Sequence, residues 1–444
     1  MFRAEVRRND RWRRRSTFMS SLRFLAGLLV STSAVFAATP STAWRPFSDA
    51  SPWNRRIAPE ATADPDSRAL IADFASRGAL HINIKDWSIP VYFVDAAATP
   101  KRDVGDSRPG VYGAGFEFPR RIPIPDGAIA SPPVGEDSDN HLCIVDRGRN
   151  LEWGMWAARQ DRTGRWFTGL GAVTDLAGTG VAAPWFAAER QLDSHRARAS
   201  GFPLVAGLML VDEFKAGRID HALVFAYDHC RSEFFAPPAS TAQATLPATK
   251  NSRGIPMGGR IQLDPAWDVE HSGLSAAGKI IAHALQEYGA YCGDYAGANV
   301  IYADNSPAAL RAWDGVLSST ELEAVFTPAM LREHFRVLDM GNLLPGQNLA
   351  VAPPYVIAFA VAGEAAPARI DQLARTISVR IGVAAGERKA VAAWQLYPAD
   401  ARVTFDGRPV ASGSGGIDLT AATDLTLTAP DGATSVWHVA VDRR

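Results

Sequence analysis

The fold class is decided by the stretch Asp139-Asn-His-Leu-Cys-Ile-Val-Asp-Arg-Gly-Arg-Asn-Leu-Glu-Trp-Gly-Met-Trp156. Two strand-like runs flank the turn sequence Arg-Gly-Arg-Asn, a pattern typical of a β-hairpin. A turn centred on residues 148–149 places Val145 opposite Glu152 and His141 opposite Trp156. Because side chains alternate along a strand, Asp139, His141, Glu152 and Trp156 are predicted to share one face of the sheet.

Similar short runs recur on both sides of this hairpin, separated by turn residues about every ten positions. They are Ser88–Val94, Leu204–Val211, Ile219–Tyr227 and Arg260–Leu263. Many short strands with Gly and Pro between them predict a β-sandwich or jelly-roll domain with a few helices. Helices are expected at residues 66–77, at 277–288, where apolar residues recur every three or four positions, and near Ser319–Phe335.

A second β-rich domain is predicted after the Pro-rich linker at residues 343–354. Apolar and polar residues alternate beyond it, in Tyr355–Val361, Thr376–Val383, Arg402–Phe405, Asp424–Ala429 and Ser435–Val441. Asp-Gly pairs at 406–407 and 431–432 indicate tight turns. The segments Ala368–Thr376 and Asp431–Val441 resemble bacterial immunoglobulin-like modules. The expected organisation is therefore a β-sandwich domain at 38–345, which would carry any catalysis, and an immunoglobulin-like accessory domain at 350–444.

The N-terminus has the features of a secretory signal peptide at residues 1–37, with Met19 as an alternative start. Arg23 precedes an apolar run at 24–30 that is too short to span a bilayer, and Val35 and Ala37 are small residues at the spacing a signal peptidase reads. These residues predict a secreted or periplasmic protein with no integral membrane segment after cleavage.

Charge is distributed unequally along the chain. The net charge is −1, but residues 1–37 carry eight arginines against two acidic residues, which leaves the rest of the chain at −7. A chain of that charge has no general attraction to nucleic acid or anionic lipid. Neither class of partner is expected.

The three cysteines, Cys143, Cys230 and Cys292, are widely spaced and form no Cys-x-x-Cys motif. This excludes a zinc knuckle and a thioredoxin motif. After export, one pair could oxidise and leave one thiol over. Three buried, reduced cysteines fit the sequence equally well.

Candidate chemistry lies in three groups of residues. The first is the hairpin face, which would also be unremarkable if it faced solvent. The second contains Arg198, the acids Asp212 and Glu213 at the expected end of a strand, and His221 at the start of the next strand. A His on an apolar strand face is often only a hydrogen-bonded core residue.

The third group contains Arg260, Tyr288 and Asp294, on both sides of the helix expected at 277–288. Arg260 could bind a carboxylate of a ligand, or it could pair with a structural acid. Tyr288 and Asp294 are polar groups that a bound sugar could contact.

The motifs around these groups are similar to those of a broad set of secreted bacterial proteins. They are Asp-x-His, Glu-x-x-x-Trp, Arg-Ala-Ser-Gly-Phe-Pro-Leu, Asp-Glu-x-x-x-Gly-x-Ile-x-His-Ala-Leu, Pro-Met-Gly-x-Arg and Ala-Leu-x-x-Tyr-Gly, within residues 46–305. The resemblance implies secretion and a carbohydrate-related role and names no reaction. The set usually has Asn-Gly after the acid that matches Asp294, where this chain has Tyr295 and Ala296.

The sequence therefore predicts a secreted enzyme that cleaves an extracellular polysaccharide, either a glycoside hydrolase or a polysaccharide lyase. Hydrolysis needs two carboxyl groups, and β-elimination needs a base and a cation that neutralises a uronate. The candidate catalytic residues are Asp139, His141, Glu152, Asp212, Glu213 and His221, and the candidate substrate-binding residues are Trp156, Arg198, Arg260, Tyr288 and Asp294. No cofactor is expected.

Two other classes of function remain open. Asp139, His141 and His221 have the composition of a two-His-one-carboxylate metal site in a jelly roll. A non-catalytic polysaccharide-binding or surface protein would keep the aromatic residues without needing the acids. The signatures of serine hydrolases, P-loop proteins, zinc proteases and dinucleotide-binding enzymes are absent from the sequence.

Overall fold

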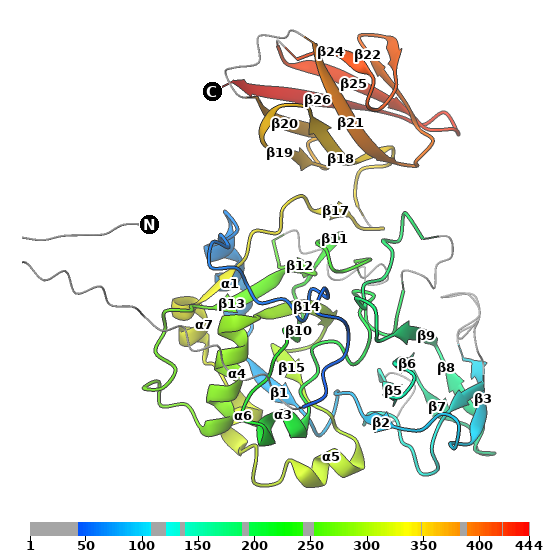
Figure 1. Cartoon of the computed structure of the whole chain (residues 1–444), viewed down its shortest axis with the longest axis vertical. Helices are drawn as coiled ribbons and strands as arrows, with labels where there is room; N and C mark the ends of the chain where they lie inside the picture. Colours follow the sequence, from blue (N-terminus) through cyan, green and yellow to red (C-terminus); the bar gives the residue numbers. More distant parts are fainter. Residues whose placement is uncertain are drawn as a thin grey trace, which may run out of the picture. The chain divides into compact units, whose positions relative to one another are not determined.

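The computed structural model describes residues 43–107, 121–133, 138–188, 195–242, 253–347, 349–381, 389–419 and 421–443. The chain is mainly β, with several sheets of the sandwich type, which confirms the predicted fold class (Figure 1). The predicted signal peptide lies outside the described residues. No helix within those ranges combines the length and the apolar character needed to cross a bilayer.

The predicted hairpin forms in the predicted register. Val145 pairs with Glu152 as predicted, and the pairing extends to Leu142 and Met155, one position before His141 and Trp156. The hairpin belongs to a four-stranded sheet of β2 (Val91–Phe93), β5 (Leu142–Asp146), β6 (Leu151–Trp156) and β9 (Leu170–Asp175). A second four-stranded sheet consists of β4 (Arg121–Pro123), β3 (Lys101–Asp106), β8 (Trp166–Thr168) and β7 (Arg159–Gln160).

The two faces of the hairpin sheet contribute to different hydrophobic cores. Leu142 and Met155 join a small core with the β3 and β8 residues Val104 and Trp166. Cys143, on the opposite face, joins the main core of the chain. His141, Glu152 and Trp156 share the face that carries Cys143, so this face directs polar groups toward the main core.

The largest sheet outside the C-terminal region has six strands with mixed directions. Its order is β1 (His81–Asn83), β15 (Val300–Tyr302), β10 (Leu223–Tyr227), β14 (Ala290–Tyr295), β13 (Arg260–Leu263) and β16 (Phe335–Val337). The β1–β15 and β10–β14 pairs are parallel, an arrangement that the sequence did not predict. A three-stranded sheet of β12 (Pro256–Met257), β11 (Arg231–Phe235) and β17 (Leu344–Pro345) lies near it (Figure 1).

The predicted helices are present, with one correction. The periodic segment forms α4 (Ala276–Glu287), whose N-cap Ser275 accepts a hydrogen bond from Gly278 N, and α1 (Ser67–Ser76) matches the segment expected at 66–77. The segment 319–335 forms two helices instead of one. They are α6 (Ser319–Ala324) and α7 (Pro328–His334), because Thr327 caps a new helix and Pro328 cannot continue the old one. A further helix, α5 (Pro307–Ala312), follows β15.

The strand predicted at Leu204–Val211 is wrong. The chain turns at residues 204–207 and enters the short helix α3 (Val211–Lys215). Gly207 has a φ of +64°, and a Cβ there would lie 2.5 Å from Val224 N. This close approach to β10 needs glycine, so the apolar run folds as a buried turn instead of a strand.

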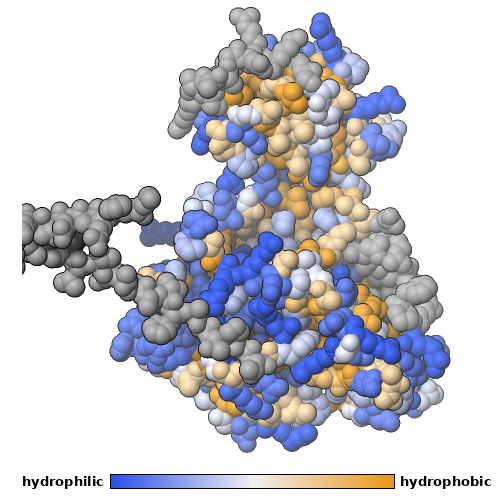
Figure 2. Space-filling view, viewed as in Figure 1, coloured by the Kyte–Doolittle hydropathy of each residue, from blue (hydrophilic) through white to orange (hydrophobic). Residues whose placement is uncertain are grey.

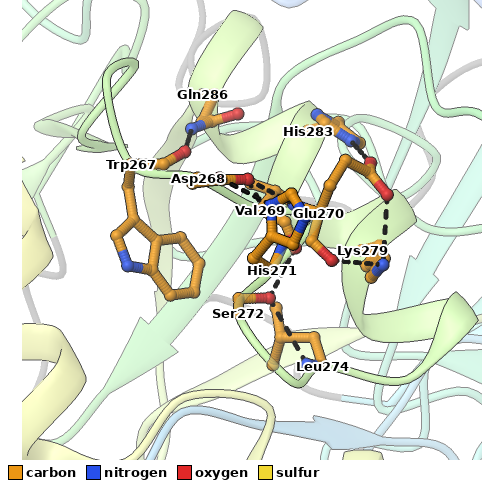
Figure 3. A network of polar contacts seen from close by, with 10 residues as sticks. All are labelled: Trp267, Asp268, Val269, Glu270, His271, Ser272, Leu274, Lys279, His283 and Gln286. Atoms are coloured by element: carbon orange, nitrogen blue, oxygen red, sulfur yellow. Dashed lines mark hydrogen bonds and ion pairs between the residues drawn. The ribbon is translucent and has the colours of Figure 1, made fainter.

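The loop before α4 is fixed by polar contacts outside any candidate site (Figure 3). Glu270 accepts hydrogen bonds from Lys279 at 3.1 Å and contacts His283 Nε2 at 3.0 Å, both on α4. His271 Nδ1 lies 2.8 Å from Asp268 Oδ2 within the loop itself. All of these side chains are largely exposed except Lys279, so the contacts order the loop without contributing much free energy of folding.

Beyond residue 350 the structure contains only strands and turns within its described ranges. One sheet contains β18 (Tyr355–Val361), β21 (Lys389–Tyr397) and β24 (Gly415–Asp418). The other contains β19 (Glu364–Asp371), β20 (Thr376–Ile381), β26 (Thr434–Arg443), β25 (Thr423–Thr428), β22 (Arg402–Phe405) and β23 (Arg408–Val410). Their buried residues form a separate cluster around Trp437.

Apolar and polar residues alternate over short distances on the face of the molecule shown in Figure 2. The large hydrophobic residues that are exposed are spread along the chain and include Trp87, Ile129, Leu310 and Val436. Scattered exposed apolar residues are normal for a soluble domain.

The boundary between the two predicted domains can be tested by truncation. A chain of residues 38–347 should stay folded and soluble, because the core around Trp437 contains no residue before Val356. The cut must follow Gly346, since Leu344 and Pro345 pair with β11 and Gly346 N donates to Glu233 O. A cooperative thermal transition of the truncated chain is the expected result. Loss of cooperativity would show that the two parts fold as one.

Candidate functional site

Three side chains meet at the open end of the β5–β6 hairpin. Trp156 Nε1 donates a hydrogen bond to Asp139 Oδ1 at 3.0 Å, and both residues are partly exposed. His141 is buried, with Nε2 3.1 Å from the carbonyl oxygen of Ala197. Burial lowers the pKa of the His141 imidazole; the Asp139 charge raises it in part, and the Arg198 charge lowers it further. The imidazole is therefore neutral near pH 7, with Nε2–H as the donor to Ala197.

Asp294 comes to the same place from β14. Its Oδ1 accepts hydrogen bonds from Tyr295 N at 3.0 Å and from Ala199 N at 3.4 Å. Burial and then the negative charge of Asp139 raise the pKa of Asp294 to about 7, against the lowering effects of Arg198 and the two N–H donors. The residue remains partly accessible to solvent. At neutral pH a substantial fraction of this carboxyl group therefore carries a proton.

Arg198 is the cation of the site. It is 2% exposed, and its guanidinium lies over the Tyr302 ring of β15 with the carbon 4.7 Å from the ring centroid. Nη2 donates to Leu204 O at 3.2 Å, whereas Nε and Nη1 are buried and have no hydrogen-bond partner among the residues that the structure describes. Unpaired buried donors cost free energy, so these two N–H groups are unsatisfied hydrogen-bond donors inside the fold.

Glu152 is fully buried and accepts hydrogen bonds from the turn to which Arg198 is also bonded. Its two carboxylate oxygens accept hydrogen bonds from Leu204 N at 2.9 Å and Val205 N at 3.2 Å. Burial raises the pKa of Glu152 despite these bonds and the nearby arginine charges. A Cβ on Gly154 would lie 2.7 Å from Glu152 Oε1, so glycine at this strand position makes room for the carboxylate. We describe Glu152 as a positioning residue.

The residues Asp139, His141, Arg198, Asp294 and Tyr302 form what we call the acid–base cluster. The charges of Asp139 and Arg198 lie close enough to His141, Asp294 and Tyr302 to influence the pKa values of those three groups. A carboxyl group with a pKa of about 7 beside a second carboxylate is an arrangement that can donate and accept protons.

The structure places three other predicted site residues elsewhere. His221 Nε2 lies 2.7 Å from Glu213 Oε1, and Nδ1 lies 3.0 Å from Ala222 O. Glu213 Oε2 also accepts from Leu210 N at the start of α3. Asp212 is exposed and pairs with Lys215 at 3.3 Å. The pairing of both His221 nitrogens and of both Glu213 oxygens within this region indicates a structural role.

His221 differs from His141 in the direction in which its pKa is shifted. Burial opposes the charged form, but the Glu213 carboxylate and its hydrogen bond raise the pKa of His221 above its usual value. Both ring nitrogens then donate hydrogen bonds. His221 and Glu213 therefore form a buried ion pair whenever the imidazole is protonated.

Arg260 and Tyr288 are also bound within the fold. Arg260 Nε donates to Tyr288 O at 2.8 Å, and Nη2 donates to Arg55 O at 2.9 Å. The guanidinium carbon lies 4.8 Å from the centroid of the Tyr291 ring. Arg260 is thus paired with backbone carbonyls, where the sequence suggested a ligand carboxylate or a structural acid. The Tyr288 side chain lies under the guanidinium of Arg56 at 5.2 Å.

The described ranges contain no group of three His, Cys, Asp or Glu side chains placed to hold a metal ion. The metal triad considered for Asp139, His141 and His221 is therefore not assembled there, because His221 is bonded to Glu213. Tyr302 is a member of the cluster that sequence reasoning missed. It lies in a short apolar strand, Val300–Tyr302, and nothing in that sequence separates it from a core tyrosine.

A pocket of about 450 Å³ lies at the other end of the hairpin, lined by Phe93, Asp146 and Arg147 among others. The Arg147 guanidinium lies 3.7 Å from the centroid of the Phe93 ring and 4.8 Å from that of Trp44. Arg147 therefore covers the aromatic surface on which a sugar ring could stack. The pocket is not part of the acid–base cluster.

Comparison with known proteins adds little to this geometry. No family model and no curated protein matches the sequence. One solved structure with local similarity is a candidate glycoside hydrolase from Bacteroides thetaiotaomicron, 20% identical, with a TM-score of 0.17. The match covers 21% of this chain and 26% of that chain. A likeness of this extent carries no argument about fold or activity.

Proposed function

We propose that this chain is an exported acid–base enzyme that cleaves a polysaccharide by glycoside hydrolysis. The observation that carries the proposal is the carboxyl group of Asp294, whose pKa is raised to about 7 by burial beside Asp139. Glycoside hydrolysis needs one carboxylic acid that protonates the leaving oxygen and one carboxylate that acts as base or nucleophile. Asp294 supplies the acid and Asp139 the carboxylate.

The surrounding residues fit these roles. The indole N–H of Trp156 donates to Asp139 Oδ1 and so orients this carboxylate, whose Oδ2 we assign to a water molecule or the sugar. The charge of Arg198 lowers the pKa of Asp294, which keeps the proton on Asp294 transferable instead of fixed. Glu152 holds the turn at Leu204 and Val205, to which Arg198 is also bonded.

A second reaction, β-elimination from a uronate-containing polymer, is favoured by one specific observation. Arg198 Nε and Nη1, which have no partner among the described residues, could bind a uronate carboxylate if the site opens to the polymer, and this carboxylate must be neutralised before the adjacent carbon loses its proton. The neutral His141 imidazole would then be the base, with Nδ1 as the accepting atom, since Nε2–H is used on Ala197.

The two reactions are separated by their products and by their pH dependence. The purified protein is incubated with a panel of extracellular polysaccharides, and reducing ends and the absorbance of unsaturated uronates are followed together. Hydrolysis gives reducing ends alone, and its rate should fall as the pH rises above 7, because Asp294 then loses its proton. Elimination gives both signals, and its rate should not fall there, since His141 is already neutral at pH 7. Absence of both signals across the panel would contradict the proposal and favour a binding protein.

A further inference from the structure

Two of the three cysteines are in direct contact inside the main core. Cys230 Sγ and Cys292 Sγ lie 3.4 Å apart, and the two residues are 3% and 0% exposed. Cys230 follows β10 and Cys292 lies within β14, and these strands are parallel neighbours in the six-stranded sheet. Cys143 is buried on β5, among the β5–β6 hairpin residues that face the main core. The sequence alone could not choose a pair among the three.

We propose that Cys230 and Cys292 are a disulfide-forming pair and that Cys143 remains a free thiol. The contact between the two sulfur atoms means that bond formation needs only a small approach of side chains that already face each other. The reaction is thiol–disulfide exchange with a disulfide oxidant, either a small molecule or an oxidoreductase. Each cysteine loses its hydrogen, the Sγ–Sγ bond forms, and the S–S bond of the oxidant is reduced to two thiols.

The environment of the pair determines when this reaction can occur. Burial raises the pKa of Cys292 well above its usual value, so the reactive thiolate is scarce in the folded protein. Both cysteine residues are also buried away from solvent. The bond should therefore form during folding or local opening, and once formed it should resist reduction in the folded state.

The link would join segments 62 residues apart and would fix the strand that carries Asp294. Cys292 is two residues before Asp294 on β14, and Cys230 Sγ already lies 3.2 Å from the Asp294 carbonyl oxygen. A cross-link that closes a loop of this length restricts the unfolded chain and stabilises the fold. This inference does not depend on the proposed reaction.

The full chain, purified in reduced form, is incubated with oxidised glutathione in a urea concentration just below the unfolding transition. It is then denatured and its remaining thiols are alkylated. We expect alkylation of one cysteine, Cys143. Before alkylation, the mass of the oxidised protein should be lower than that of the reduced protein by two hydrogen atoms. Peptide mapping should find Cys230 linked to Cys292. The oxidised protein should also melt at least a few degrees above the reduced protein.

The variants Cys230→Ala and Cys292→Ala should each show no oxidation-dependent change in melting temperature, whereas Cys143→Ala should keep the full change. Comparing each variant with itself in the two redox states removes the packing effect of the substitution. Three alkylated cysteines, glutathione adducts on either sulfur, or a cross-link through Cys143 would each overturn the assignment.

Discussion

Replacement of Asp294 by asparagine should reduce turnover by about 10²–10⁴-fold, the usual contribution of a general acid, without unfolding the protein. Asparagine keeps an oxygen that can accept the hydrogen bonds from Tyr295 N and Ala199 N, but it cannot transfer a proton. The measurement is the initial rate of polysaccharide cleavage at pH 6. Asp126→Asn is the matched control, because this carboxylate is exposed on the surface.

The same variant should be at least as stable as the natural protein at pH 8. The pKa of Asp294 is about 7 in the folded protein and near 3.8 when unperturbed, so ionisation disfavours the folded state. The stabilising contribution of the protonated form is fully present below pH 3.8 and is lost as the pH rises through 7. Removing the buried charge is worth at most about 4 kcal/mol by linkage. The stability gain should therefore appear at pH 8 and disappear at pH 4.

The combination of these two results separates a catalytic acid from a structural one. A structural carboxylate would lose stability on replacement and keep its activity per folded molecule. If Asp294→Asn cleaves the polymer within twofold of the natural rate, Asp294 is not the proton donor, and the assignment of the acid–base cluster fails.

Replacement of His221 by alanine should have the opposite effect: the protein should lose stability and keep its cleavage rate. The substitution leaves the Glu213 carboxylate buried with Oε1 unpaired, and loss of one partner of a buried ion pair costs about 3–5 kcal/mol. Urea unfolding should show this loss, while the cleavage rate of the folded protein stays within a few-fold. His271→Ala is the matched control, because His271 forms an exposed pair with Asp268 (Figure 3) and should change stability little.

The loss should also depend on pH. The pKa of His221 is raised above 6.5 in the folded protein, so the stabilisation by its charge is fully present below pH 6.5. It is lost as the pH rises through the folded pKa. The stability difference between the natural protein and His221→Ala should therefore shrink at alkaline pH. Loss of cleavage without loss of stability would instead show that His221 and Glu213 are catalytic residues and not structural ones.

The parts of the fold that the sequence predicts are those set by local patterns. The turn at residues 148–149 and the alternation around it determine the hairpin register, and three-and-four periodicity determines α4. Period-two alternation likewise locates β18 and β22 to the residue. Local patterns fail at residues 204–211, where the apolar run resembles a strand. The close approach of Gly207 to Val224 is a tertiary contact that no local pattern contains.

The sequence predicted which residues belong to the candidate site better than it predicted the chemical role of each residue. Asp139 and His141 could be selected as polar groups on one hairpin face, and Asp294 as a substrate-binding candidate after the helix at 277–288. The elevated pKa of Asp294 arises from burial and from the carboxylate of Asp139, which is far away in the sequence. No local feature of β14 therefore predicts this pKa. The roles of Glu213 and His221 depend in the same way on α3, a helix of five residues that the sequence did not predict.

The acid–base cluster combines segments that are far apart along the chain: His141 and Ala197 are separated by 56 positions, and Ala199 and Asp294 by 95. Closing loops of this length is slow relative to forming a hairpin or a helix. During biosynthesis the hairpin can form long before β14 and β15 have been made. A partly synthesised or partly folded chain can thus have its hairpin and helices without a complete acid–base cluster. The proposed activity therefore requires that β14 and β15 have packed against the rest of the fold.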